Sequence, residues 1–180
     1  MNNLDELATL VPEKVGVDSK IVHASEKNHC HSLLMGACAH GATECAKYLL
    51  DNNANPNLKN FHGFTALHWA AFTGRTETVQ LLIDAGANIE SRTADGKTAL
   101  HIAAFRGQRG FIEVLVNLGA DINAVDAEGL NALHFAGLAN QQATVEYLRR
   151  MNIIETQMDA HKRTLRDFAV EKNITWLIPQ

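Results

Sequence analysis

The residues that could do chemistry are concentrated in one stretch near the start of the sequence, HCHSLLMGACAHGATEC. Histidine and cysteine are common zinc ligands, and a cysteine beside a histidine can act as a nucleophile. The spacing matches no common zinc pattern, and no third group is placed to orient a Cys–His pair. We therefore expect no metal and no cofactor, and keep a metal protein or a small enzyme as the less favoured alternative. The members of this His29–Cys45 cluster are His29, Cys30, His31, Cys38, His40 and Cys45.

A second set of histidines recurs at a fixed interval. His68, His101 and His134 each close a TALH or NALH motif, and each follows the last by 33 residues. Because they occupy equivalent places one period apart, they cannot converge on one metal ion. We expect each of them to tie the start of its own helix to the adjoining loop by hydrogen bonds.

The same interval organises most of the chain. Stepping by 33 residues from Ser32 gives SLLMGACAHG, TALHWAAFTG, TALHIAAFRG, NALHFAGLAN and TLRDFAVEKN, and each segment ends on glycine or asparagine. These two residue types most readily adopt the left-handed conformation that ends a helix. Two further rows share the period, so chance agreement is excluded and a repeat array is predicted. The rows are Asn53, Gly86, Gly119 and Asn152, and Gly63, Gly96 and Gly129.

One period predicts two short helices and a turn-rich loop. Thr65 can cap the first helix, because its hydroxyl can accept from free backbone N–H groups. The second helix, ETVQLLIDAG, carries Val79 and Leu82 at helical spacing. The loops that follow, such as NIESRTADGK, have the composition of turns.

The segments TALHWAA, TALHIAA and NALHFAG, followed by GANIE and GADIN, resemble ankyrin repeats, whose signature is T-P-L-H-x-A at this period. Ala66, Ala99 and Ala132 stand where proline is usual, and alanine is an equally acceptable helix former there. The resemblance implies an all-α solenoid of paired antiparallel helices joined by β-hairpin-like loops. It implies four repeats within residues 28–158, with boundaries at 27–59, 60–92, 93–125 and 126–158.

The two ends depart from the period, and we expect them to cap the array. Residues 1–27 are expected to form a helical N-terminal cap, with helices in LDELATLV and DSKIVHAS. Residues 159–180 are expected to form a truncated C-terminal capping repeat, in which Arg166 replaces a repeated leucine and Trp176, Leu177 and Ile178 close the core.

The composition is that of a folded protein in a reducing compartment. Hydrophobic residues make up 46% of the chain, charged residues 20%, and the formal net charge is -4. Such a charge does not favour nucleic acid or an anionic membrane as partner, and no apolar run is long enough to span a bilayer. The N-terminus has no secretory pattern and the three cysteines are odd in number, so we expect a cytoplasmic monomer, with the nucleus as an alternative location.

The ankyrin resemblance implies a non-catalytic module that binds a partner protein through its concave face and hairpin tips. Two rows of variable positions are rich in apolar residues, with arginine and lysine beside them, so we expect a partner segment with apolar anchors and some acidic character. Phe72 and Phe105 could instead pack between adjacent helices. Within this class, an inhibitor or regulatory subunit that occludes an enzyme, or a secreted pathogen effector, is an alternative. The expected contact residues are Lys59, Phe61, His62, Phe64, Phe72, Thr73, Arg92, Asp95, Lys97, Phe105, Arg106, Leu130 and Leu138.

Overall fold

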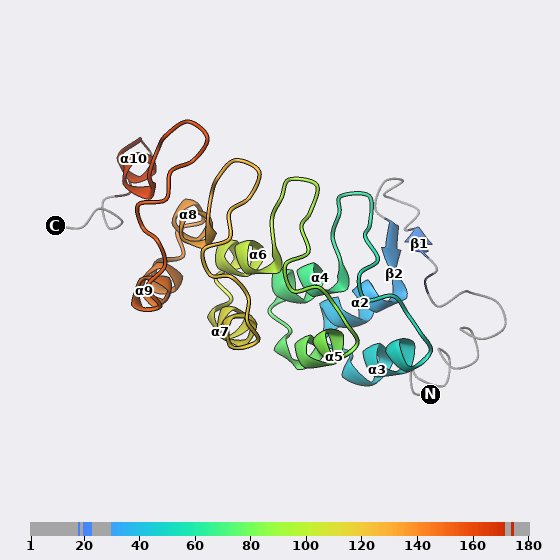
Figure 1. Cartoon of the computed structure of the whole chain (residues 1–180). Coiled ribbons are helices and arrows are strands. Elements are labelled where there is room, and N and C mark those ends of the chain that lie inside the picture. The colour runs from blue at the N-terminus through green and yellow to red at the C-terminus, as the bar shows by residue number, and fades with distance from the viewer. Residues whose placement is uncertain (1–17, 19, 23–29, 172–173, 175–180) are drawn as a thin grey trace.

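The computed structural model describes residues 18, 20–22, 30–171 and 174 of the chain. Its helices lie in two rows, and hairpin loops project from the side of the inner row (Figure 1). The inner row consists of α2 (Leu33–His40), α4 (Ala66–Thr73), α6 (Ala99–Arg106), α8 (Ala132–Leu138) and α10 (Leu165–Glu171). The outer row consists of α3 (Thr43–Asp51), the short 3-10 helix η1 (Thr76–Thr78) with α5 (Val79–Asp84), α7 (Arg109–Asn117) and α9 (Gln142–Arg150). The architecture is the predicted all-α solenoid.

The glycine and asparagine rows end helices and turn hairpins as predicted. Gly41, Gly74, Gly107 and Asn140 follow the inner helices, and all four have positive φ angles. The other two rows also have positive φ at every position named above. Left-handed backbone at these places is what allows the chain to reverse direction within so few residues.

The core is continuous along the array because each helix pair buries the same kinds of residue. Small side chains, among them Ala70, Ala103 and Ala136, are fully buried on the inner helices and let neighbouring helices approach closely. Leucines of the outer helices fill the space behind them, and these leucines also recur at the period: Leu49, Leu82, Leu115 and Leu148.

The prediction of a helix in DSKIVHAS is wrong where the structure describes this segment. Lys20–Val22 form strand β1, which pairs antiparallel with β2 (Cys30–Ser32). Ile21 and Val22 are β-branched and favour a strand, and pairing satisfies backbone groups that β2 would otherwise expose. The side chain of Asp18 also accepts a hydrogen bond from Asn55 N, at 3.0 Å. The predicted helix in LDELATLV and the closing residues Trp176, Leu177 and Ile178 lie outside the described residues.

Within the described part of the chain, no helix has the length and apolar character needed to cross a membrane.

Candidate functional site

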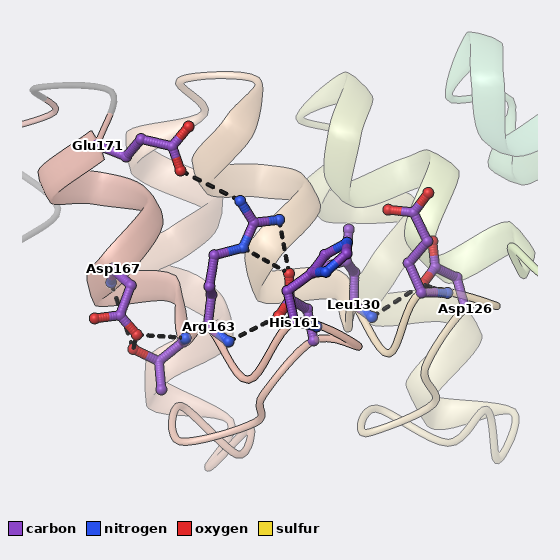
Figure 2. Close-up of polar contacts among 9 residues, drawn as sticks. Asp126, Leu130, His161, Arg163, Asp167 and Glu171 are labelled. Carbon is purple, nitrogen blue, oxygen red and sulfur yellow. Dashed lines mark hydrogen bonds and ion pairs between the residues drawn. The ribbon is translucent and has the colours of Figure 1, made fainter.

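One short polar side chain shapes each hairpin, and these residues also recur every 33 positions. Asn60 Oδ1 accepts from His62 N at 3.0 Å and from Phe64 N at 2.9 Å. Asp126 Oδ1 accepts from Glu128 N and Leu130 N, both at 2.9 Å, and Asp159 holds the last hairpin in the same way (Figure 2). We did not predict this role, although stepping by 33 residues would have revealed the row Asn60, Thr93, Asp126 and Asp159.

The hairpins pack directly against one another. Ala94 N donates to His62 O at 3.0 Å, and Ala127 N donates to Asp95 O at 3.2 Å. A Cβ atom at Gly63 would lie 2.6 Å from Ala94 N, so only glycine permits this approach. The result is a row of hairpin tips with a fixed spacing, standing above the inner helices.

The repeated histidines connect the inner helices to the hairpins that follow them. Thr65 N and Thr65 Oγ1 lie 3.1 and 2.8 Å from His68 Nδ1, and both are donors to that nitrogen. The proton of the neutral ring is therefore on Nε2, which donates to Lys97 O at 3.2 Å. Burial lowers the pKa of His68 to about 4, so the ring is neutral at physiological pH. The prediction that this histidine ties its helix to the adjoining loop is confirmed.

His101 repeats this arrangement, whereas His134 does not. His101 Nε2 donates to Ala124 O at 2.9 Å, and burial lowers its pKa to about 4 as well. His134 Nδ1 accepts from Asn131 N at 3.4 Å and lies 2.8 Å from Asn131 Oδ1, and among the described residues its Nε2 makes no hydrogen bond as short and well aligned as that of His101 to Ala124 O. Burial lowers the pKa of His134, and a hydrogen bond with the backbone of Gln157, in the adjoining loop, acts in the opposite direction.

An apolar hollow of about 190 Å³ opens on the concave face, with a lining drawn from the second, third and fourth repeats. Four phenylalanine rings line it, together with His101, Ile102 and Lys97. Phe105 is the most exposed of these rings, with 46% of its surface accessible. The four rings are Phe64, Phe72, Phe105 and Phe135.

The structure therefore brings together four of the predicted contact residues: Phe64, Phe72, Lys97 and Phe105. His101, Ile102 and Phe135 also line the hollow, and we did not predict them as contact residues. The signal was present, because the residue after each TALH or NALH motif is large and apolar.

Phe72 serves packing as well as the hollow. The Arg106 guanidinium lies over its ring at 4.3 Å, and Arg106 Nε donates to Phe72 O at 3.3 Å. The Trp69 ring meets it edge-on, with 5.8 Å between centroids. Phe72 is 37% exposed, so it contributes both to packing between adjacent helices and to the surface of the hollow.

The basic residues expected along the groove are engaged in holding the hairpins. Lys59 Nζ donates to Arg92 O at 2.9 Å, and Arg92 donates in turn to Val125 O on the next hairpin. Lys97 Nζ pairs with Asp95 Oδ2 at 3.2 Å. Lys59 and Arg92 thus connect neighbouring repeats, whereas the Lys97–Asp95 pair lies within one hairpin, and the position of these residues in the sequence does not reveal either role.

The remaining predicted contact residues lie apart from the first hollow. Phe61 is 77% exposed at a hairpin tip beside His62, and Leu138 is exposed at the end of α8. The hydroxyl of Thr73 donates to Trp69 O at 3.1 Å. Leu130 was expected at the surface, but it is only 6% exposed, because it packs into the core at the base of its hairpin.

A second, more polar hollow of about 490 Å³ lies between the tips of the third and fourth hairpins. It shares Lys97 and Phe135 with the apolar hollow, so the two adjoin. Three carboxylates line it against the single ammonium of Lys97. The carboxylates are those of Asp95, Asp126 and Glu128.

The described members of the His29–Cys45 cluster do not form a site. Cys38 is fully buried in α2, where loss of solvation raises the pKa of its thiol to about 12 although Thr78 hydrogen-bonds to it. Such a thiol is a poor nucleophile. Cys45 is half-buried on α3, and His40 Nδ1 lies 2.9 Å from Gly36 O. Among the described residues, no three His, Cys, Asp or Glu side chains are grouped to hold a metal ion; His29 and the side chains of Cys30 and His31 lie outside them.

The hairpins, the paired helices and the buried TALH histidines define a helical repeat protein of the solenoid class. The family model described as ankyrin repeats (3 copies) matches residues 2–93 and 85–159. The chain therefore belongs to the ankyrin repeat family, whose members are generally non-enzymatic protein–protein interaction modules. A search of curated proteins found no match.

Proposed function

We propose that this protein is a non-catalytic interaction module that binds a partner protein through its concave face and hairpin tips. One observation carries the proposal: the apolar hollow on this face, lined by four phenylalanine rings. Exposed apolar side chains gathered around a concave surface are typical of binding sites, whereas single ones are common anywhere.

Phe105 is the residue on which we expect binding to depend most. Nearly half of its surface is exposed, while its neighbour Phe72 lies beneath Arg106. Desolvation of such an aromatic anchor typically supplies about 2 kcal/mol or more of binding free energy. We therefore expect Phe105→Ser to weaken binding roughly thirtyfold with little loss of stability.

The experiment is affinity purification with mass spectrometry, comparing wild type, Phe105→Ser and Ile154→Ser. Ile154 is the matched control, because it is 47% exposed and lies outside both hollows. Partners that the wild type and the Ile154 variant retain and the Phe105 variant loses support the proposal. Equal recovery by all three proteins, with equal melting temperatures, contradicts it.

The proposal keeps the repeat boundaries predicted from the sequence, a monomeric state and a cytoplasmic or nuclear location. Light scattering on the purified protein tests the monomer. An inhibitor or regulatory subunit and a pathogen effector would use the same face, and the identity of the captured partner separates them.

A further inference from the structure

The two adjoining hollows differ in chemistry, and this difference bears on what they bind. The first is almost wholly apolar, and its volume of about 190 Å³ is sufficient for one aromatic or branched aliphatic side chain. For comparison, an apolar protein cavity of about 150 Å³ accommodates benzene.

The second hollow has an excess of negative charge. Asp95 is paired with Lys97, and its side chain is 74% exposed. Asp126 uses one carboxylate oxygen to hold its own hairpin, so its charge stays fixed at the wall. Glu128 is exposed at the tip, and its backbone oxygen, rather than its side chain, accepts from Ala160 N.

The nearby cations do not cancel this charge. Lys97 is the one basic residue in the lining of the second hollow, and it also lies 5.7 Å from the centroid of Phe135. Arg92 donates to the backbone carbonyls of Gly96 and Val125. Arg106 lies over the ring of Phe72, which lines the apolar hollow. Complementarity therefore favours a positively charged group from the partner.

Resting on the proposed function, we infer that the partner presents a linear segment in which a large apolar side chain and a lysine or arginine lie close together. The apolar side chain occupies the first hollow, and the cationic side chain enters the second between Asp95 and Glu128. This differs from the acidic partner expected from the sequence, because the basic residues on which that expectation was based are engaged within the protein.

The test is selection from a random dodecapeptide library displayed on phage, using the folded full-length protein as bait. Selected peptides are then synthesised, and their affinity is measured by fluorescence polarisation. We expect enrichment of Phe, Leu, Ile, Met or Trp within a few residues of Lys or Arg.

Two variants with the same change in charge assign the cation to its hollow. Asp95→Asn with Glu128→Gln neutralises the second hollow, and we expect it to weaken peptide binding about threefold to tenfold and to reduce the salt dependence. Glu44→Gln with Glu146→Gln neutralises two exposed carboxylates on the outer helices α3 and α9, and we expect it to leave binding unchanged.

The outcomes separate this inference from the proposed function. Peptides that bind wild type and lose affinity for Phe105→Ser, but carry acidic or no charged residues, overturn the inference and leave concave-face binding intact. Peptides that bind Phe105→Ser as tightly as wild type, or the absence of any enriched peptide, count against both. An equal loss of affinity in the two charge variants also overturns the inference, because the cationic side chain would then not bind specifically in the second hollow.

Discussion

His101 and His134 begin equivalent helices one repeat apart, yet they take part in different hydrogen bonds. The hydroxyl and N–H of Thr98 donate to His101 Nδ1, which leaves the proton on Nε2 to reach Ala124 O in the next loop. Asn131 has no hydroxyl, and its side-chain oxygen already accepts from Leu133 N and His134 N. His134 Nδ1 accepts from Asn131 N at 3.4 Å and lies 2.8 Å from this oxygen.

The capping residue at the start of the helix thus affects which atom donates a hydrogen bond to the next loop. At the Asn131 junction, Asn131 Nδ2 itself donates across to the next loop, to Ile154 O at 2.9 Å. In the last unit, Asp167 replaces the histidine and accepts from both N–H and hydroxyl of Thr164, at 2.7 and 2.8 Å (Figure 2). A carboxylate has no proton to donate onward, which suits a unit at the end of the array.

Acidification is expected to have the largest effect, and to act mainly at the inner junctions. His68 and His101 have pKa values of about 4 in the folded protein and near 6.5 when unfolded, so the unfolded state binds more protons below pH 6.5. Their contribution is complete above pH 6.5, and about 4 kcal/mol of unfolding free energy should be lost by pH 5. Urea titrations between pH 7.5 and 5 measure this loss.

The control for acidification is His101→Gln, which removes one of the three histidines whose pKa burial lowers and should flatten the pH dependence. The lowered pKa values of Asp159 and Asp167 contribute only at lower pH, since carboxylate stabilisation is lost on protonation. A urea midpoint that does not move between pH 7.5 and 5 would contradict the neutral buried state of these histidines.

Removal of single histidines compares the two junctions directly. His101→Ala leaves the Ala124 carbonyl without its donor and a space beside Phe135, and we expect it to cost about 3 kcal/mol. His134→Ala should cost about 1 kcal/mol less, because its Nε2 makes no hydrogen bond as short and well aligned as that of His101. Chemical denaturation of both variants checks the order, and equal losses would show that the crossing bond is worth nothing.

The C-terminal unit can be loosened without disturbing the inner junctions. Arg163 bonds to Asp159 Oδ2 through Nε and Nη2, pairs with Glu171 at 3.3 Å, and lies over the Phe168 ring at 4.3 Å. We expect Arg163→Ala to speed hydrogen exchange severalfold in α10 and to leave α4 and α6 unchanged. Faster exchange throughout the array would mean that the last unit is not a separate element of stability.

The smallest expected effect comes from an exchange of capping residues. Asn131→Thr should add a hydroxyl contact to His134 Nδ1 and remove the Asn131 Nδ2 bond to Ile154 O, and Thr98→Asn should remove the hydroxyl contact to His101 Nδ1. Because each variant exchanges one hydrogen bond for another, we expect the free energy of unfolding to change by about 1 kcal/mol or less. The imidazole ¹⁵N chemical shifts report the hydrogen bonds of the ring nitrogens, and unchanged shifts in both variants would show that the capping residue does not determine them.

Features that depend on local chemistry at a fixed period were predictable from the sequence. Gly74 and Asn140 end helices because of their own conformational freedom, and the period shows that they share one role. The buried face of alanines followed in the same way. Phe72 and Phe105 could be selected as candidate residues because nothing in the repeat itself explains a phenylalanine there.

Features that depend on contacts between repeats were not predictable in this way. Arg106 covers Phe72 and Arg92 reaches Val125 only because successive units stack at a particular distance. Leu130 occupies a variable position yet is buried, since its hairpin folds inward at that point. The strand Lys20–Val22 lies outside the period and pairs with a segment ten residues later, so the repeat pattern could not predict it.

The backbone bonds between hairpins have a consequence for the length of the molecule. Each tip accepts from the following one, as His62 does from Ala94, Asp95 from Ala127 and Glu128 from Ala160. In the language of assemblies this is a head-to-tail, heterologous contact, which has no closing symmetry and would by itself propagate into an open filament. This contact sets no limit on the number of repeats that it could join. On α10, the last helix that the structure describes, charged side chains such as Arg166 and Glu171 are exposed alongside the apolar Val170.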